Sequence, residues 1–250
     1  MRFAAIADIH GNCAALEAVL TDIGQQGIPT NAIVNLGDCL SGPLEAGRTA
    51  ELLLSLDLPT VRGNHDRYLV EHAEGAMHSW EADAFRQLTP EHLDWLKTLP
   101  FSLVWHADVY LCHATPKDDQ TYWLEVVKPD GSVCLKPRAE IEALAEGVSQ
   151  PLILCGHSHL PRAVRLSDGR LIVNPGSVGC PAYDDDTPYY HRVEAGTPLA
   201  SYAICEKKDG DWAVTFRLVP YDHMSQSRLA GENGRPSWEA GLATGWLADQ

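Results

Sequence analysis

The first quarter of the chain alternates short apolar strands with amphipathic helices, and this alternation constrains the fold more than any other feature. Residues 2–7 (RFAAIA) and 32–36 (AIVNL) predict buried strands, and residues 59–63 predict a third, shorter strand. Residues 13–26 and 44–56 carry apolar positions at helical spacing. Strands joined through helices in this way are expected to form a largely parallel sheet with helices packed on its faces.

The rest of the chain changes from helices to strands. Residues 66–99 predict helices with a break at Thr89-Pro90, where Thr89 is a suitable N-cap and Pro90 a suitable first helical residue. A further helix is expected at 138–146. Seven strands are expected, at 101–105, 109–112, 152–155, 162–166, 170–173, 200–207 and 212–219. Two of the connections contain an Asp-Gly pair, which is typical of hairpin turns.

This order of elements predicts an α/β fold with two packed sheets and helices outside them. We expect residues 1–222 to form one domain. Residues 223–250 are expected to be a C-terminal tail, because they contain Gly and Ser and show no strong periodicity.

Composition and charge exclude several classes of protein. The chain has 250 residues and a formal net charge of −15, so binding of nucleic-acid phosphates is disfavoured. It contains no apolar run of the roughly 18 residues that a membrane span needs, and its short apolar start predicts a strand, not a signal peptide. We therefore expect a cytoplasmic protein. The seven widely spaced cysteines contain no CxxC motif and are expected to be small buried residues.

Five short polar segments directly follow predicted strands. They are Asp8-Ile9-His10, Gly37-Asp38, Gly63-Asn64-His65-Asp66, Cys112-His113 and Gly156-His157-Ser158-His159. In α/β sheets, ligands bind in the loops beyond the carboxyl ends of the strands. We therefore expect these Asp, Asn and His side chains to meet at one rim of the fold.

Imidazole and carboxylate groups together favour divalent metals such as Mn, Fe, Zn, Ni or Co. The two oxygens of a carboxylate such as Asp38 allow it to bridge two ions. Two ions roughly 3.5–4 Å apart can hold both the attacking and the leaving oxygen of a displacement at phosphorus. They would also give this acidic protein the local positive charge that an anionic substrate needs.

The motifs DIH (8–10), GD (37–38), GNHD (63–66), LCHATP (111–116) and GHSH (156–159) resemble those of the calcineurin-like metallophosphoesterase superfamily. The segment NPGSVG (174–179) is similar to its small bacterial phosphodiesterase branch. The resemblance implies a four-layer α/β/β/α sandwich of two mixed sheets flanked by helices. It also implies a phosphoester hydrolase with two divalent metal ions.

The resemblance implies a role for each motif residue. The ligands of the first metal would be Asp8, His10 and His159. Those of the second would be Asn64, His113 and His157. Asp38 would bridge the two ions. His65 would assist the leaving group as a general acid, and Asp66 would orient His65 or, alternatively, cap the following helix.

Two features depart from the family pattern. The segment after Asp38 lacks the Asp-Arg-Gly of the Ser/Thr protein phosphatase branch, which argues against that substrate class. Residues 180–198 form a longer connection with three consecutive aspartates, which we expect to be a solvated loop or, alternatively, a lid over the site or an oligomer contact.

The sequence therefore predicts hydrolysis of a phosphodiester or phosphomonoester in a small molecule, by hydroxide attack on phosphorus. A nuclease, a dinucleoside polyphosphate hydrolase and a non-catalytic scaffold are the alternatives. The polyphosphate alternative needs additional cations near the rim, for which the candidates are Arg62, Lys117, Arg138 and Arg162. The expected partner is a small phosphate ester, with no membrane, and a nucleic-acid partner is disfavoured. The natural substrate, the resident metals and the oligomeric state stay open.

Overall fold

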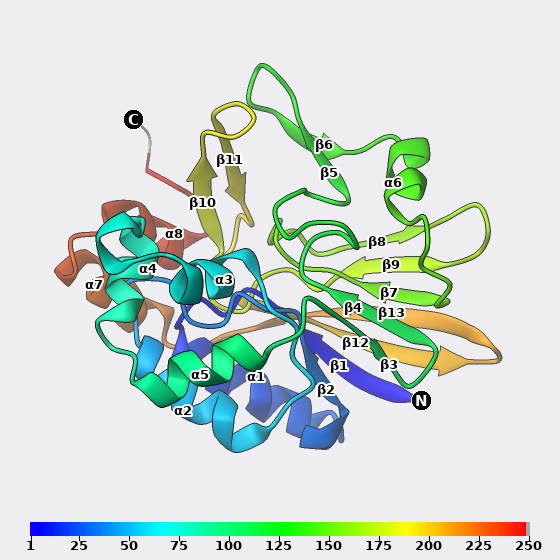
Figure 1. The fold of residues 1–250 in the computed structure, drawn as a ribbon, viewed down its shortest axis with the longest axis horizontal. Coiled ribbons are helices and arrows are strands. Elements are labelled where there is room, and N and C mark those ends of the chain that lie inside the picture. Colours follow the sequence, from blue (N-terminus) through cyan, green and yellow to red (C-terminus); the bar gives the residue numbers. More distant parts are fainter. Residues whose placement is uncertain (249–250) are drawn as a thin grey trace.

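Two mixed sheets pack face to face in the computed structural model, which describes residues 1–248 (Figure 1). The first sheet has the order β13-β12-β1-β2. Its strands are β1 (Arg2–Ile6), β2 (Ile33–Asn35), β12 (Ala200–Lys208) and β13 (Asp211–Val219). The second sheet has the order β3-β4-β7-β9-β8. Its strands are β3 (Ser102–Trp105), β4 (Val109–Cys112), β7 (Leu152–Leu154), β8 (Arg162–Arg165) and β9 (Leu171–Asn174).

Three apolar clusters define four layers. Alternate residues of β1 face opposite ways: Phe3 and Ala5 point between the sheets, while Ala4 and Ile6 point outward. The outward face packs on α1 (Cys13–Gln25), α2 (Ala46–Leu56) and α5 (Pro90–Thr98). The outer face of the second sheet packs on α6 (Arg138–Leu144), through Ile141. This confirms the α/β/β/α sandwich that the sequence and its family resemblance predict.

Two predicted elements differ from the structure. Residues 59–63 form no strand, because Thr60 makes only one isolated parallel bridge, with Asn35. Pro59 has no N–H to extend the ladder, and the chain enters a helix directly after Gly63. The helical region 66–99 is divided more finely than expected. It contains α3 (Asn64–Glu71), the 3₁₀ turn η2 (Glu74–Ala76), α4 (Ser79–Phe85) and α5; another 3₁₀ turn, η1 (Thr30–Ala32), precedes β2.

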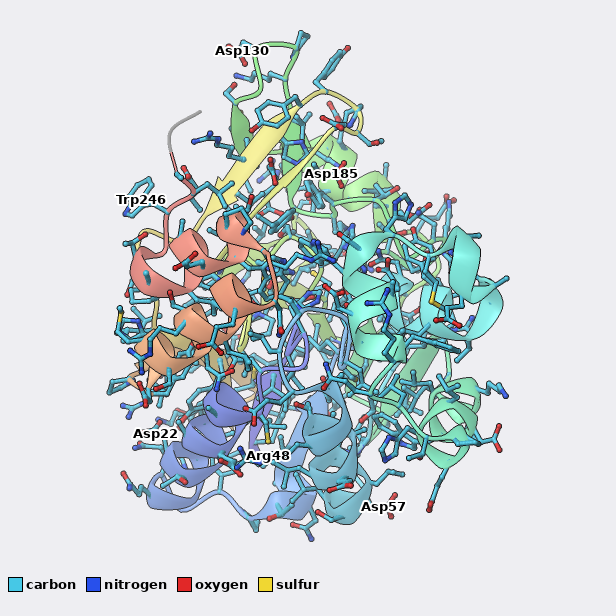
Figure 2. All side chains as sticks on the ribbon, turned by 90° about the vertical axis from the view of Figure 1, so that its left-hand side faces the viewer. Asp22, Arg48, Asp57, Asp130, Asp185 and Trp246 are labelled. Atoms are coloured by element: carbon cyan, nitrogen blue, oxygen red, sulfur yellow. The ribbon has the colours of Figure 1, made fainter. Side chains whose placement is uncertain are left out.

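Two hairpins that the sequence did not predict lie beside each other at one end of the molecule. One consists of β5 (Glu125–Val127) and β6 (Val133–Leu135), and the other of β10 (Ala182–Asp185) and β11 (His191–Glu194). Figure 2 shows Asp130 at the end of the first hairpin and Asp185 on the second, whereas Asp22 and Arg48 lie at the opposite end of the molecule. Residues 180–198 are thus built around a hairpin and not an irregular loop, although residues 184–190 at its tip are exposed as a solvated loop would be.

The segment after residue 222 contains two packed helices, α7 (His223–Glu232) and α8 (Pro236–Thr244). The Trp238 side chain is buried against Leu44, Cys180 and Tyr183. Six of the seven cysteines are buried, and all seven are free. Within the described chain, no helix combines the length and the apolar character that crossing a membrane requires.

Candidate metal centre and cleft

Four parallel strands bring the polar motifs together. The strands β1 and β2 are parallel neighbours in one sheet, and β4 and β7 are parallel neighbours in the other. Asp8, Asp38, His113 and His157 each lie one to three residues beyond the end of one of these strands. Because the two sheets pack face to face, their carboxyl ends meet at one rim. The predicted site residues therefore converge although they are up to 151 residues apart in the chain, the separation between Asp8 and His159.

Two groups of side chains in the described chain have the arrangement of a metal site. Asp8, His10 and His159 form one group, and Asp38, His113 and His157 form the other. Within each group the ligand atoms lie within 4.8 Å of one another. The members are buried except for His157, which is partly buried. The grouping separates the residues in the way that the family resemblance implies.

His10 and His159 each present an unprotonated Nε2 atom that can bind a cation. His10 Nδ1 lies 3.1 Å from the Ser41 carbonyl oxygen, and His159 Nδ1 lies 2.8 Å from the Cys180 carbonyl oxygen. A carbonyl only accepts, so each Nδ1 carries the proton and each Nε2 presents a lone pair. The two Nε2 atoms are 3.2 Å apart. Two lone pairs at this distance repel each other, and a divalent ion bound to both removes the repulsion. The donor set therefore fits a metal ion.

Asp38 belongs to the second group and also faces His10 of the first. Its Oδ2 atom is 3.2 Å from His113 Nε2 and 3.9 Å from His10 Nε2. The Asn64 amide oxygen also lies 3.1 Å from His113 Nε2. The Nδ1 atom of His113 donates to the Leu36 carbonyl at 2.8 Å, which leaves Nε2 as the atom that faces the site. Asp38 is thus placed to contact ions in both groups.

The backbone at these residues is strained. Five of the seven expected ligands have left-handed φ values, between 50° and 70°: Asp8, His10, Asp38, His157 and His159. Such values are uncommon for residues other than glycine, and they concentrate at functional sites. Glycines allow the close packing around the ligands, since a Cβ atom at Gly156 would lie 2.9 Å from Asp8 Oδ2.

Burial and mutual charge set the pKa values of the acidic groups in the absence of a metal. Burial raises the pKa of Asp8 to about 8. Burial acts in the same direction on Asp38, but the positive charges of His113 and His65 outweigh it and hold its pKa well below the usual value.

Burial and neighbouring charges also raise the pKa values of some histidines and lower those of others. Burial opposes the charge of His113, but the neighbouring Asp38 carboxylate outweighs burial and raises the pKa of His113 to about 10. Burial lowers the pKa of His10 to about 3 and that of His157 to about 4. These last two imidazoles are therefore neutral at pH 7, which is the form that binds metals.

His65 stands beside the two groups and faces a cleft. Its backbone N–H donates to Asp38 Oδ1 at 3.0 Å, and its ring lies 5.3 Å from that of His10. Its Nδ1 forms a short hydrogen bond with the buried carboxylate of Glu81. Burial opposes the charge of His65, but Asp38 and Glu81 outweigh it and raise its pKa.

Asp66 does not make the orienting contact with His65 that the family resemblance implies. Its Oδ2 accepts from the N–H groups of Asp38 and Gly63 at 2.8 and 3.0 Å, and its Oδ1 accepts from that of Cys39 at 2.9 Å. Both oxygens are thus directed at backbone, and the alternative role as a helix cap fits this geometry. The partner of His65 is Glu81, which no sequence motif marks.

The segment NPGS (174–177) packs against the backbone of the rim residues. The Ser177 hydroxyl donates to the Asp8 carbonyl at 2.7 Å, and the Asn174 amide donates to the Gly156 carbonyl at 2.7 Å. These contacts fix the backbone that carries Asp8 and His157. The segment therefore packs against the site.

A cleft of about 1220 Å³ opens over the two groups. Its walls come from α3, α4, the hairpin β5–β6 and the hairpin β10–β11. Carboxylates outnumber cations on these walls. The acidic residues are Asp38, Glu81, Asp118, Glu125, Asp184, Asp185 and Asp186, and the single lysine or arginine on these walls is Lys136.

The four cations that could bind additional phosphate groups near the rim do not line this cleft, and each has an acidic partner. Arg62 lies 3.8 Å from Glu71, and Lys117 lies 3.8 Å from Glu146. The others pair in the same way: Arg138 with Glu142 at 3.7 Å and Arg162 with Glu125 at 2.9 Å.

This fold and this rim of Asp, Asn and His residues define the class of the protein. The profile of the calcineurin-like phosphoesterase superfamily domain matches residues 1–197, so the chain belongs to that superfamily. Its members are metal-dependent, and membership implies hydrolysis of a phosphoester.

Individual relatives resemble the chain over nearly its whole length. A metallophosphoesterase crystal structure from Sphaerobacter thermophilus is 28% identical, with a TM-score of 0.73, covering 98% of this chain and 100% of that one. An uncharacterized Methanocaldococcus jannaschii protein is 28% identical, with 94% of each chain covered. A Pyrococcus horikoshii OT3 crystal structure, at 20% identity and a TM-score of 0.75, covers 99% of each chain and shows the likeness of fold alone.

Proposed function

We propose that this protein hydrolyses a phosphodiester or phosphomonoester of a small molecule, with two divalent metal ions in the rim site. One observation carries the proposal: two ligand groups, with Asp38 between them, lie at the base of a large cleft beside His65. Two ions bound there would polarise the phosphoryl oxygens and lower the pKa of water. The ions would be Mn, Fe, Zn, Ni or Co, because the ligands combine imidazole and carboxylate.

The residues of the chain supply the rest of the chemistry. Asp8, His10 and His159 would hold one ion, and Asn64, His113 and His157 the other. Asp38 would contact both. In its doubly protonated form His65 would donate from Nε2 to the leaving oxygen, while its Nδ1 stays bonded to Glu81.

The charge of the cleft supports a substrate with one phosphate group. A nuclease or a dinucleoside polyphosphate hydrolase needs cations along the walls to bind further phosphates. Lys136 is the single lysine or arginine that lines this cleft, and its Nζ donates to the Tyr122 carbonyl at 2.6 Å. The acidic walls would repel a chain of phosphates, so the phosphodiester or phosphomonoester of a small molecule fits better.

A turnover assay tests the proposal. The protein is stripped with a chelator, reloaded with one metal at a time, and supplied with bis(4-nitrophenyl) phosphate and 4-nitrophenyl phosphate. Comparison of the two rates also gives the preference between diester and monoester. We expect turnover with at least one of the metals and a loss of at least about 100-fold in Asp38→Asn, since the charged carboxylate that would contact both ions is removed.

The control variant is Asp94→Asn, which makes the same chemical change on the exposed face of α5. It should keep the wild-type rate. If the wild type shows no turnover with any of the five metals, the enzyme proposal fails and a non-catalytic scaffold becomes the better account.

A further inference from the structure

We propose that Glu81 is a positioning residue that holds the imidazole of His65 with Nε2 toward the cleft. This inference rests on the function proposed above, in which His65 assists the leaving group. Glu81 lies on α4, 16 residues beyond His65 and outside every motif. Its side chain is 1% exposed, and its Oε1 atom bonds to His65 Nδ1.

The hydrogen bond fixes the proton arrangement of the ring. A carboxylate accepts, so His65 donates from Nδ1. In the imidazolium form Nε2 carries the second ring proton, and that is the proton available to a leaving oxygen. Within the described chain, no other hydrogen bond competes for the Glu81 carboxylate. Its other oxygen, Oε2, is buried and has no hydrogen-bond partner in the described chain. The carboxylate therefore acts on His65 in particular.

The neighbouring residue on α4 fixes the plane of the ring. Trp80 stacks on His65 with the ring centres 5.3 Å apart and the planes 15° from parallel. The backbone N–H of His65 donates to Asp38. His65 is thus held through its backbone, its ring face and its Nδ1 atom. Orientation of this kind raises the effective concentration of a catalytic group at the reacting atoms.

The helix α4 is itself anchored on two sides. The Trp80 carbonyl accepts from the N–H of Gly42 at 3.1 Å, in the loop that follows Asp38. On the other side, Trp80 packs edge-on against Trp238 of α8 at 4.8 Å, and Asp83 pairs with Arg235 at 2.6 Å. These contacts make α4 a fixed support from which Glu81 reaches His65.

The experiment compares two substrates that differ in leaving group. Diphenyl phosphate releases phenolate, which is a poorer leaving group than the nitrophenolate of bis(4-nitrophenyl) phosphate and depends more on proton donation. We expect Glu81→Ala to lower kcat about 10–100-fold with diphenyl phosphate and much less with the nitrophenyl ester. KM and bound metal should stay unchanged. Glu81→Gln keeps an acceptor oxygen at the same reach and should restore a large part of kcat.

A double-mutant cycle separates positioning from a general structural effect. In a His65→Ala background, adding Glu81→Ala should cause no further loss of kcat, because the group that Glu81 positions is absent. The control Glu74→Gln neutralises an exposed carboxylate in η2 and should keep the wild-type rate.

Three results would overturn the inference: an equal loss with both substrates, a loss of metal, or a full additional loss in the His65→Ala background. Each of these requires an active wild type, so they differ from failure of the proposed function, in which the wild type itself is inactive with both substrates.

Discussion

Gly63 packs so closely on Asp38 that a Cβ atom at position 63 would lie 2.0 Å from Asp38 Oδ1. The next closest atoms are also from Asp38, its backbone nitrogen at 2.5 Å and its carboxyl carbon at 2.7 Å. No Cβ can occupy this position without moving the residue that lies between the two ligand groups. The glycine in the GNHD motif is therefore required by packing, in addition to the chemistry of its neighbours.

We therefore expect Gly63→Ala to displace Asp38, to lower stability by about 1–3 kcal/mol and to weaken metal binding. Chemical denaturation and metal analysis of the purified protein measure the two effects. Gly24→Ala is the matched control, because nothing lies within 4 Å of a Cβ at that position in α1. It should raise stability by about 0.5–1 kcal/mol. Normal metal content in Gly63→Ala would contradict the packing argument.

The facing Nε2 atoms of His10 and His159 predict that metal stabilises the fold. A metal that binds only the native state at 100 times its Kd stabilises by about 2.7 kcal/mol. Adding Mn²⁺ to chelator-treated protein should therefore raise Tm, as measured by calorimetry, and His159→Ala should reduce the rise. His106→Ala, at the opposite end of β4 from His113, should keep the full rise. An equal rise in both variants would argue against this ligand assignment.

The raised pKa of His113, about 10, predicts that metal binding releases protons. At pH 8 the metal-free imidazole is protonated, so an ion must displace that proton to reach Nε2. Metal affinity should therefore increase as pH rises toward 10. Titration calorimetry in Hepes and in Tris, which differ in ionisation enthalpy, should give different apparent binding enthalpies. Identical enthalpies would show that no proton is released.

Asp22 predicts a separate pH dependence of stability, away from the site. The Asp22 carboxylate accepts from Arg217 at 2.7 Å and from the Tyr202 hydroxyl at 2.6 Å. The Arg217 hydrogen bond, supported by that from Tyr202, lowers the pKa of Asp22 against the opposing effect of burial. A carboxylate with a lowered native-state pKa adds stability that is fully present above its unfolded-state pKa and is lost as pH falls through the native value.

Asp22→Asn should accordingly lower the free energy of unfolding by about 1 kcal/mol at pH 7. The difference should shrink as pH falls through the lowered native-state pKa of Asp22, because the wild-type carboxyl group then becomes protonated. Urea denaturation at several pH values measures the difference. A difference that stays constant down to the lowest pH at which the wild type remains folded would mean that the ion pair is not its source.

The convergence of these Asp, Asn and His side chains could be predicted because each motif directly follows an apolar strand. Strand ends are visible in a linear pattern, and parallel strands place them at one rim. Glu81 was missed because its role depends on how α4 packs against α3, which no local pattern records. The left-handed backbone at Asp8 and His10 was equally hidden, since neither residue type requires that conformation.

The outer parts of the fold were harder to predict for the same reason. The strands β10 and β11 are four residues long, and β10 includes two exposed aspartates, so they lack an apolar alternation. Helix α8 was missed because small residues such as Ala and Gly weaken its periodicity, although Trp238 anchors it beside Trp80. The strands β10 and β11 pair with each other, and α8 packs against them through Trp238 and Leu242, contacts that a linear pattern does not show.

The most direct test of the account is a titration of activity against metal equivalents. Chelator-treated protein receives measured equivalents of Mn²⁺, and hydrolysis of bis(4-nitrophenyl) phosphate is followed at each step. A two-ion site predicts that activity rises and becomes constant at two equivalents per chain, and that Asp38→Asn stays inactive throughout. Full activity at one equivalent would contradict the two-ion site, and full activity in the absence of any metal would contradict the central claim itself.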